Sequence, residues 1–315
     1  MGLRGRATSV ALAALTLAGC GGSSNSSSAP TTTAAAKARP LFAYDASRPL
    51  AYRDAGRANG PYPVAVRNVS YATPSGRVPA YLAVPLKGTK LPAVIYLHGS
   101  GESRERFLLP AIWVAGRGAV GMTLTLPSSS SGAQPTGLTP SQRLARDRAV
   151  FASDVIAVRR AVDVLSANPR VDANRIGLVG WSLGARVGAV LAGVEPRLHT
   201  VVLMSGGSLP VSAYVAQTPV ALQKEVRQSL TQIDPLRWIA KAKPGTIMLQ
   251  DGKKDEIVPR NALVALSRAA PKGTVLRWYP AGHELNAQAY KDQLAFLTKK
   301  LPITGPPVKG AQTGP

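Results

Sequence analysis

The chain has 315 residues, of which 38 are Lys or Arg and 16 are Asp or Glu, so its formal net charge is +22. Basic proteins of this kind often bind nucleic acid, but here the basic residues are scattered, without a dense run or interleaved aromatic residues. We therefore expect no specific nucleic-acid partner. Anionic lipid and envelope polymers are the partners that the charge favours, and a lineage-wide preference for arginine explains it equally well.

The N-terminal segment indicates export. Arg4 and Arg6 precede a mostly apolar stretch over 9–18, which is too short to span a bilayer. The run Leu17-Ala18-Gly19-Cys20 resembles the lipobox of bacterial lipoproteins, and this resemblance implies that Cys20 is lipidated and becomes the mature N-terminus. We predict a signal peptide over 1–19 and an exported protein, anchored through Cys20 at the outer face of the bacterial cell membrane. A cleaved secretory signal with an incidental cysteine is the alternative.

Cys20 is the only cysteine, so the folded part offers no cysteine nucleophile and no thiolate metal site. Residues 20–40 are dominated by Gly, Ser, Thr and Ala and bury too little apolar surface to order themselves, which predicts a disordered, lipid-anchored tether. Residues 302–315 are also predicted to be a disordered tail. The intervening 41–301, about 260 residues, suffice for one large α/β domain.

The predicted elements begin with two strands, 64–71 and 78–84, joined by a turn at 73–76. After them, apolar runs that predict buried strands alternate with segments of helical spacing. The strands are expected over 93–97, 119–126, 176–179, 200–204, 246–249 and 274–279, and the helices over 106–116, 141–165, 183–193, 261–269 and 288–299.

This order predicts an α/β fold with a doubly wound, mostly parallel sheet of about eight strands and an antiparallel N-terminal pair. Ligands of such sheets bind at the carboxyl ends of the strands. The one long connection, 205–243, is predicted to hold a short helix around 222–230 and to act either as a lid or as a plain crossover.

A possible nucleophile stands at the carboxyl end of the 176–179 strand. Gly180-Trp181-Ser182-Leu183-Gly184 has the pattern G-x-S-x-G between a strand and a helix, which indicates a nucleophile elbow with Ser182 at its tip. The flanking glycines allow strand and helix to meet closely around the strained turn. Trp181 is as compatible with core packing as with a substrate contact.

A serine nucleophile needs a base and an orienting acid. In elbow enzymes the acid and then the histidine follow the serine along the chain. His98 precedes Ser182 and is expected to hold its own loop, while His199 lies before the 200–204 strand, at the amino end of the sheet. His283 follows the last predicted strand and is therefore the expected base.

The acid is expected after the 246–249 strand. Asp255 lies in the loop beyond this strand and can reach a histidine on the neighbouring loop, so we choose it. Asp251, at the end of the strand, and Glu256 are the alternatives.

An oxyanion hole needs at least two donors. One is expected to be the backbone N–H of Leu183, directly after the nucleophile. The other is expected from the loop His98-Gly99-Ser100-Gly101, either the amide of Ser100, slightly favoured, or that of Gly101.

Taken together, these motifs resemble the α/β-hydrolase superfamily, and most of all its dienelactone hydrolase and prolyl-oligopeptidase-like branch. The resemblance covers 64–301 and rests on the loop at 98–101, the elbow at 180–184, Gly252-x-x-Asp255-x-x-Val258-Pro259 and Gly282-His283. It implies the α/β-hydrolase fold and a serine hydrolase that cleaves carboxylic esters through an acyl-enzyme, acting on a small-molecule or acylated ester.

Three other functions remain open: a serine peptidase, an acyltransferase with the same triad, and a non-catalytic envelope-binding lipoprotein. No cofactor or metal is expected. His283-Glu284 is not followed by the second histidine of H-E-x-x-H, a Walker A motif is lacking, and the glycine spacing at 177–184 does not fit dinucleotide binding.

Overall fold

The computed structural model describes residues 40–130 and 135–305. The predicted signal peptide, Cys20 and the tether up to residue 39 lie outside the described residues, as do residues 306–315 of the predicted tail.

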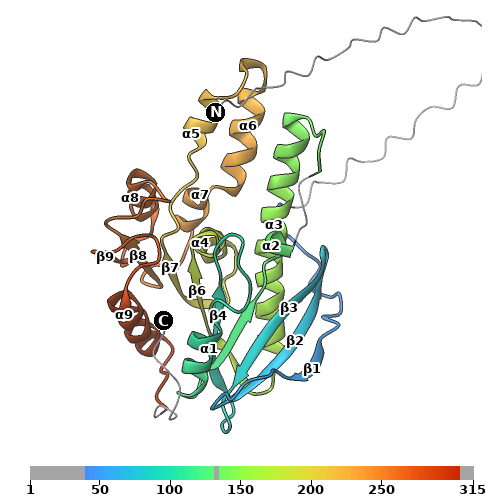
Figure 1. Cartoon of the computed structure of the whole chain (residues 1–315), viewed down its shortest axis with the longest axis vertical. Coiled ribbons are helices and arrows are strands. Elements are labelled where there is room, and N and C mark those ends of the chain that lie inside the picture. Colours follow the sequence, from blue (N-terminus) through green and yellow to red (C-terminus); the bar gives the residue numbers. More distant parts are fainter. Residues whose placement is uncertain (1–39, 131–134, 306–315) are drawn as a thin grey trace, which may run out of the picture. The chain divides into compact units, whose positions relative to one another are not determined.

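A nine-stranded sheet with the order β1-β2-β3-β5-β4-β6-β7-β8-β9 forms the centre of the fold (Figure 1). The pairings β1–β2, β2–β3 and β3–β5 are antiparallel, and every pairing from β5 to β9 is parallel. The strands are β1 (Arg53–Arg57), β2 (Ala65–Thr73), β3 (Gly76–Val84), β4 (Leu91–Leu97), β5 (Val120–Leu124), β6 (Val171–Trp181), β7 (Leu198–Met204), β8 (Ile247–Gly252) and β9 (Val275–Tyr279). The expected mostly parallel sheet with its antiparallel beginning is confirmed, and β1 is a strand that the sequence did not predict.

Helices cover both faces of this sheet. They are α1 (Leu108–Ala115), α2 (Pro127–Ser130), α3 (Pro140–Ala167), α4 (Leu183–Val194), α5 (Val211–Ala216), α6 (Val220–Ile233), α7 (Pro235–Ile239), α8 (Arg260–Ala269) and α9 (Ala287–Lys300). One buried cluster joins the strands to α3 and α4, and a second joins them to α1 and α9. The two clusters make the core a three-layer packing of helices, sheet and helices.

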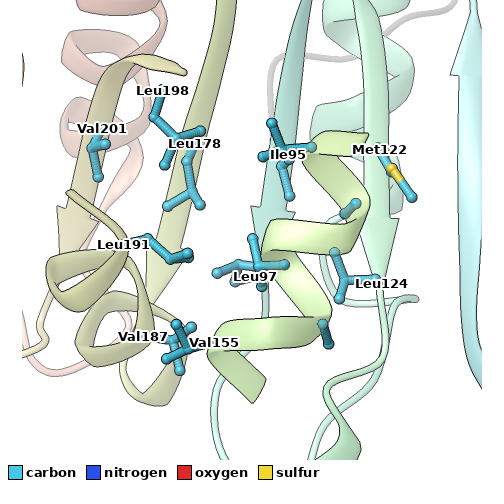
Figure 2. Close-up of a cluster of buried hydrophobic side chains, with 14 of the residues drawn as sticks. Ile95, Leu97, Met122, Leu124, Val155, Leu178, Val187, Leu191, Leu198 and Val201 are labelled. Atoms are coloured by element: carbon cyan, nitrogen blue, oxygen red, sulfur yellow. The ribbon is translucent and has the colours of Figure 1, made fainter. Parts of the chain in front are cut away.

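The central strands are apolar on both faces because both are covered. In β4, Ile95 and Leu97 face the cluster with α3 and α4, whereas Val94 and Tyr96 face the cluster with α1 and α9. Figure 2 shows Ile95 and Leu97 in the first cluster, beside side chains of the helices. This explains why β4 is a continuous apolar run instead of an alternating one.

The long connection after β7 contains α5, α6 and α7. The predicted helix at 222–230 is thus the middle part of the longer α6. Polar contacts hold α6 against the first turns of α3: Ser141 Oγ donates to Glu225 Oε2 at 2.8 Å, and Arg148 Nη1 donates to Gln232 Oε1 at 3.2 Å. Whether this connection acts as a lid stays a prediction.

The packed chain continues past Leu301, where the predicted domain ends. Ile303 is only 3% exposed and belongs to the cluster with α1 and α9. The N–H of Gly305 donates to the carbonyl of Arg117 at 2.9 Å. The predicted start of the disordered tail at residue 302 is therefore corrected, because 302–305 pack against the domain.

Among the described residues, no helix combines the length and apolarity needed to cross a membrane.

Candidate active site

A sharp turn between β6 and α4 presents Ser182. Its φ of 55° lies in the left-handed region, which is uncommon for a residue with a side chain. A Cβ added to Gly180 would lie 2.2 Å from the carbonyl oxygen of Gly184, and one added to Gly184 would lie 2.4 Å from that of Leu97. Both contacts are with backbone atoms that cannot move aside, so the elbow requires glycine at both flanks.

Three side chains from separate loops form a chain of hydrogen bonds beside this turn. His283, in the loop after β9, lies with Nε2 2.9 Å from Ser182 Oγ and with Nδ1 2.9 Å from Asp255 Oδ2. The other carboxylate oxygen, Asp255 Oδ1, accepts the backbone N–H groups of Ile257 and Val258, each at 2.9 Å.

These partners indicate the protonation of the imidazole. A carboxylate oxygen can only accept, so Nδ1 of His283 carries a proton and donates it to Asp255. In the neutral ring Nε2 then has a free lone pair, which accepts the hydroxyl proton of Ser182. The side chain of Asp255 is 1% exposed and that of His283 is 13% exposed, so the imidazole is the more accessible of the two.

Of the three acids that the sequence left open, Asp255 is the one that contacts His283. Asp251 is the penultimate residue of β8 and is 4% exposed, and burial together with the charge of Asp255 raises its pKa to about 7. Glu256 is exposed to solvent.

The other two histidines have other surroundings. His98 is 1% exposed, and its Nε2 accepts the N–H of Leu126 at 3.0 Å. Its Nδ1 must therefore be protonated, and it donates to the carbonyl of Gly99 at 2.7 Å. Burial lowers the pKa of His98, which favours this neutral form. His98 thus holds the loop after β4, whereas His199 is exposed at the amino end of β7, close to Lys243 and Lys300.

The candidate oxyanion donors lie at the start of α4 and in the loop after β4. Leu183 is the first residue of α4, so its N–H has no acceptor within the helix. The N–H of Gly184 donates to the carbonyl of His98 at 3.1 Å, and that of Gly99 donates to Glu102 Oε2 at 3.1 Å. Ser100 and Gly101 follow in this anchored loop and are both exposed. The choice between their amides stays a prediction.

Two further side chains bind the loop that carries the base. Trp181 Nε1 donates to the backbone carbonyl of His283 at 2.9 Å, and Ser205 Oγ donates to the same oxygen at 3.0 Å. The sequence left Trp181 open between packing and substrate contact and did not single out Ser205. The one sequence signal for Ser205, a serine directly after an apolar strand, is too common to indicate a role.

The family model described as "BAAT / Acyl-CoA thioester hydrolase C terminal" matches residues 158–263. A comparison with curated proteins gives no match. Among solved structures, an acetyl xylan esterase from a Paenibacillus species superposes with a TM-score of 0.69 at 16% identity, over 83% of this chain and 91% of that one. Acetyl xylan esterase 1 from a Thermoanaerobacterium species gives 0.69 at 18% identity, over 83% and 91%.

A cold-adapted esterase from an Arctic intertidal metagenomic library gives a TM-score of 0.59 at 18% identity, over 78% of this chain and 98% of that one. These superpositions show that the chain has the α/β-hydrolase fold, and the family match over 158–263 is to a hydrolase domain. The fold expected from the sequence is thereby confirmed. Within the described residues, no group of three or more His, Cys, Asp or Glu side chains is placed to hold a metal ion.

Proposed function

We propose that the protein is a serine hydrolase that cleaves carboxylic esters through an acyl-enzyme. The observation that carries the proposal is the continuous hydrogen-bond chain from Ser182 through His283 to Asp255. A serine hydroxyl is a weak nucleophile at neutral pH, and a base within hydrogen-bond reach is what activates it.

In the first half of the reaction, Ser182 Oγ attacks the ester carbonyl carbon while His283 Nε2 takes the hydroxyl proton. The carbonyl oxygen becomes an oxyanion, which accepts the N–H of Leu183 and that of Ser100 or Gly101. The tetrahedral intermediate then breaks its bond to the alcohol oxygen, and His283 returns the proton to this leaving group. The product of this half is an ester of Ser182.

In the second half, water attacks the acyl carbon while His283 removes a proton from it. A second tetrahedral intermediate collapses, His283 protonates Ser182 Oγ, and the carboxylic acid leaves. Asp255 orients the imidazole in both halves and stabilises its cation. The two backbone N–H groups on Asp255 Oδ1 support this role, because they hold the carboxylate whose other oxygen accepts from Nδ1.

Two rival activities share this machinery. The family match to acyl-CoA thioester hydrolases favours thioesters as a second substrate class, with hydrolysis or acyl transfer as the outcome. A serine peptidase would use the same residues on amides. A non-catalytic envelope-binding protein is disfavoured, because such a protein has no need of the two 2.9 Å contacts of His283.

Hydrolysis of p-nitrophenyl acetate by wild type and by Ser182→Ala tests the proposal. We expect the variant to lose roughly 10⁴-fold or more in kcat. Circular dichroism shows whether both proteins are folded, and equal rates of the two folded proteins would contradict the proposal. Parallel assays with an acyl-CoA thioester and an acylated peptide amide, followed by product analysis, separate the rival activities.

We also propose that the enzyme is exported and anchored to the membrane through a lipid on Cys20. The support is the charged and apolar N-terminal segment and the sequence Leu17-Ala18-Gly19-Cys20. The net charge of +22 favours anionic envelope polymers as neighbours. Mass spectrometry of the mature N-terminus is expected to find a lipid on Cys20, and a Cys20→Ala variant is expected to leave the membrane fraction. An unmodified Cys20 in the mature protein would contradict the anchor.

A further inference from the structure

We propose that Trp181 and Ser205 are positioning residues, which hold the backbone carbonyl of His283 and thereby keep its imidazole against Ser182. This inference rests on the proposed function, because it concerns how the base of that reaction is held in place. Both side chains donate to one oxygen, at 2.9 Å from Trp181 and 3.0 Å from Ser205.

Both donors lie next to backbone that also fixes the nucleophile. Trp181 directly precedes Ser182, and Ser205 directly follows Met204, whose carbonyl accepts the N–H of Ser182 at 2.9 Å. The base is therefore tied to the nucleophile twice: through its ring at Nε2 and through its own backbone. The loop that carries His283 is thereby held in a fixed position relative to the ends of β6 and β7. A fixed position is what keeps His283 Nε2 2.9 Å from Ser182 Oγ.

The indole of Trp181 is itself fixed from three sides. A Cβ added to Gly99 would lie 2.5 Å from its Cζ3, so the loop after β4 packs directly against the ring. The ring centroids of Trp181 and His283 lie 5.1 Å apart. Arg106 lies 4.7 Å from the centroid of the indole and forms ion pairs with Glu102 and Glu284, which belong to the loops on either side. The indole is thus held by packing contacts in addition to its hydrogen bond to the His283 carbonyl.

Ser205 has an unfavourable backbone conformation, and the hydrogen bond of its hydroxyl explains why a serine is found there. Its φ is 51°, in the left-handed region that favours glycine, although Ser205 is fully buried and two glycines follow it. Glycine would be the more stable residue at this φ, but it lacks the hydroxyl that reaches His283. The strain at Ser205 is therefore a cost in stability that serves the placement of the base.

The test uses full-length Trp181→Phe, Ser205→Ala and Ser205→Gly variants. For each, we would measure kcat and KM with p-nitrophenyl acetate, the rate of fluorophosphonate labelling, and Tm. We expect kcat and the labelling rate to fall roughly tenfold in each variant, with KM changed less than about twofold. Ser205→Gly is expected to keep or raise the Tm while it loses activity.

Trp238→Phe is the matched control, because Trp238 Nε1 also donates to a backbone carbonyl at 2.9 Å, that of Gln232, away from the triad. It is expected to lower Tm without slowing labelling. If the wild type reacts and the Trp181 and Ser205 variants react equally fast, this inference is overturned and the proposed function is not. Activity that falls only in step with Tm, or through KM, would also overturn it. A wild type that fails to react would overturn the proposed function, and this inference with it.

Discussion

Asp251 and Asp255 are four residues apart at the carboxyl edge of the sheet, but their surroundings differ. Asp255 accepts a hydrogen bond from the base and two from backbone amides. Asp251 is buried beside it, and its raised pKa of about 7 reflects burial and the repulsion from Asp255. Two neighbouring carboxyl groups in different environments can therefore have different functions.

The first prediction separates these two acids. Asp255→Asn is expected to lower kcat by roughly 10³–10⁴-fold, because an amide no longer selects the Nδ1-protonated tautomer of His283. Asp251→Asn is expected to keep kcat within a few-fold of wild type. Ester hydrolysis at neutral pH measures both. Loss of activity in Asp251→Asn, with Asp255→Asn active, would reverse the roles that we propose.

The second prediction concerns stability against pH. The pKa of Asp251 is raised from 3.8 to about 7, so in this window the folded state holds a proton that the unfolded state has released. Stability from this group is therefore fully present below the unfolded pKa and is lost as pH rises through the folded pKa. We expect Asp251→Asn to gain in Tm relative to wild type as pH rises from about 4 to about 7. A difference in Tm that is constant over this range would contradict the raised pKa.

At the scale of elements, the approach of α4 to β4 and β6 decides whether the elbow forms. Gly184 faces the backbone carbonyl of Leu97, whereas Gly188, one turn further along α4, faces side-chain atoms of Leu178, Leu203 and Val201. Side-chain atoms can rotate away from an added methyl group, and backbone atoms of a central strand cannot.

The third prediction follows from this pair of glycines. Gly184→Ala is expected to cost about 3 kcal/mol or more in the free energy of unfolding and to abolish activity. Gly188→Ala is expected to cost about 1 kcal/mol or less, because repacking and a better helix propensity offset the tight contact. Chemical denaturation of the two variants makes the comparison. Equal losses would show that the backbone contact at Gly184 is not what limits the turn.

The C-terminal segment gives the fourth prediction. Removal of residues 302–315 exposes the pocket of Ile303 and deletes the hydrogen bond between Gly305 and Arg117, whereas removal of 306–315 keeps both. Burial of an isoleucine side chain contributes about 2 kcal/mol. The chain that ends at Leu301 is therefore expected to melt several degrees below the chain that ends at Gly305. Identical Tm values would contradict the packed segment.

Elements with a strong apolar pattern were predictable from the sequence, and elements formed by pairing were not. The apolar runs of β4 and β7 and the helical spacing of α3 are local signals. β1 has the sequence RDAGR with four of its five residues exposed. It is a strand only because its backbone pairs with the free edge of β2. The four-residue α2 likewise has no buried residue and no apolar period.

The same distinction holds for the site. Ser182 and His283 were predictable because glycines mark the elbow and because chain order selects one histidine out of three. The sequence favoured Asp255 over Asp251 through its place in the loop beyond the strand, but the contact of Asp255 with His283 is visible only in three dimensions. Ser205 was not predictable, because its role depends on the end of β7 meeting a loop 78 residues further along the chain.

At the scale of the whole molecule, the candidate site is made by neighbouring strands that are far apart in sequence. β4, β6, β7, β8 and β9 are consecutive in the sheet, and the loops or residues at their carboxyl ends carry the proposed oxyanion amides, the proposed nucleophile, Ser205, and the proposed acid and base. Only the folded parallel sheet brings these ends to one edge. Local unfolding of any of these strands is therefore expected to cost activity.

The most direct test of the account is covalent labelling of the full-length enzyme with a fluorophosphonate, followed by mass spectrometry of its peptides. An activated serine is phosphonylated, and within the described residues Ser182 is the serine whose hydroxyl lies at hydrogen-bond distance from an imidazole ring. We predict one adduct per chain, on Ser182, and none in Ser182→Ala. The absence of an adduct on the folded protein, or an adduct on another residue, would contradict the proposal that Ser182 is the catalytic nucleophile.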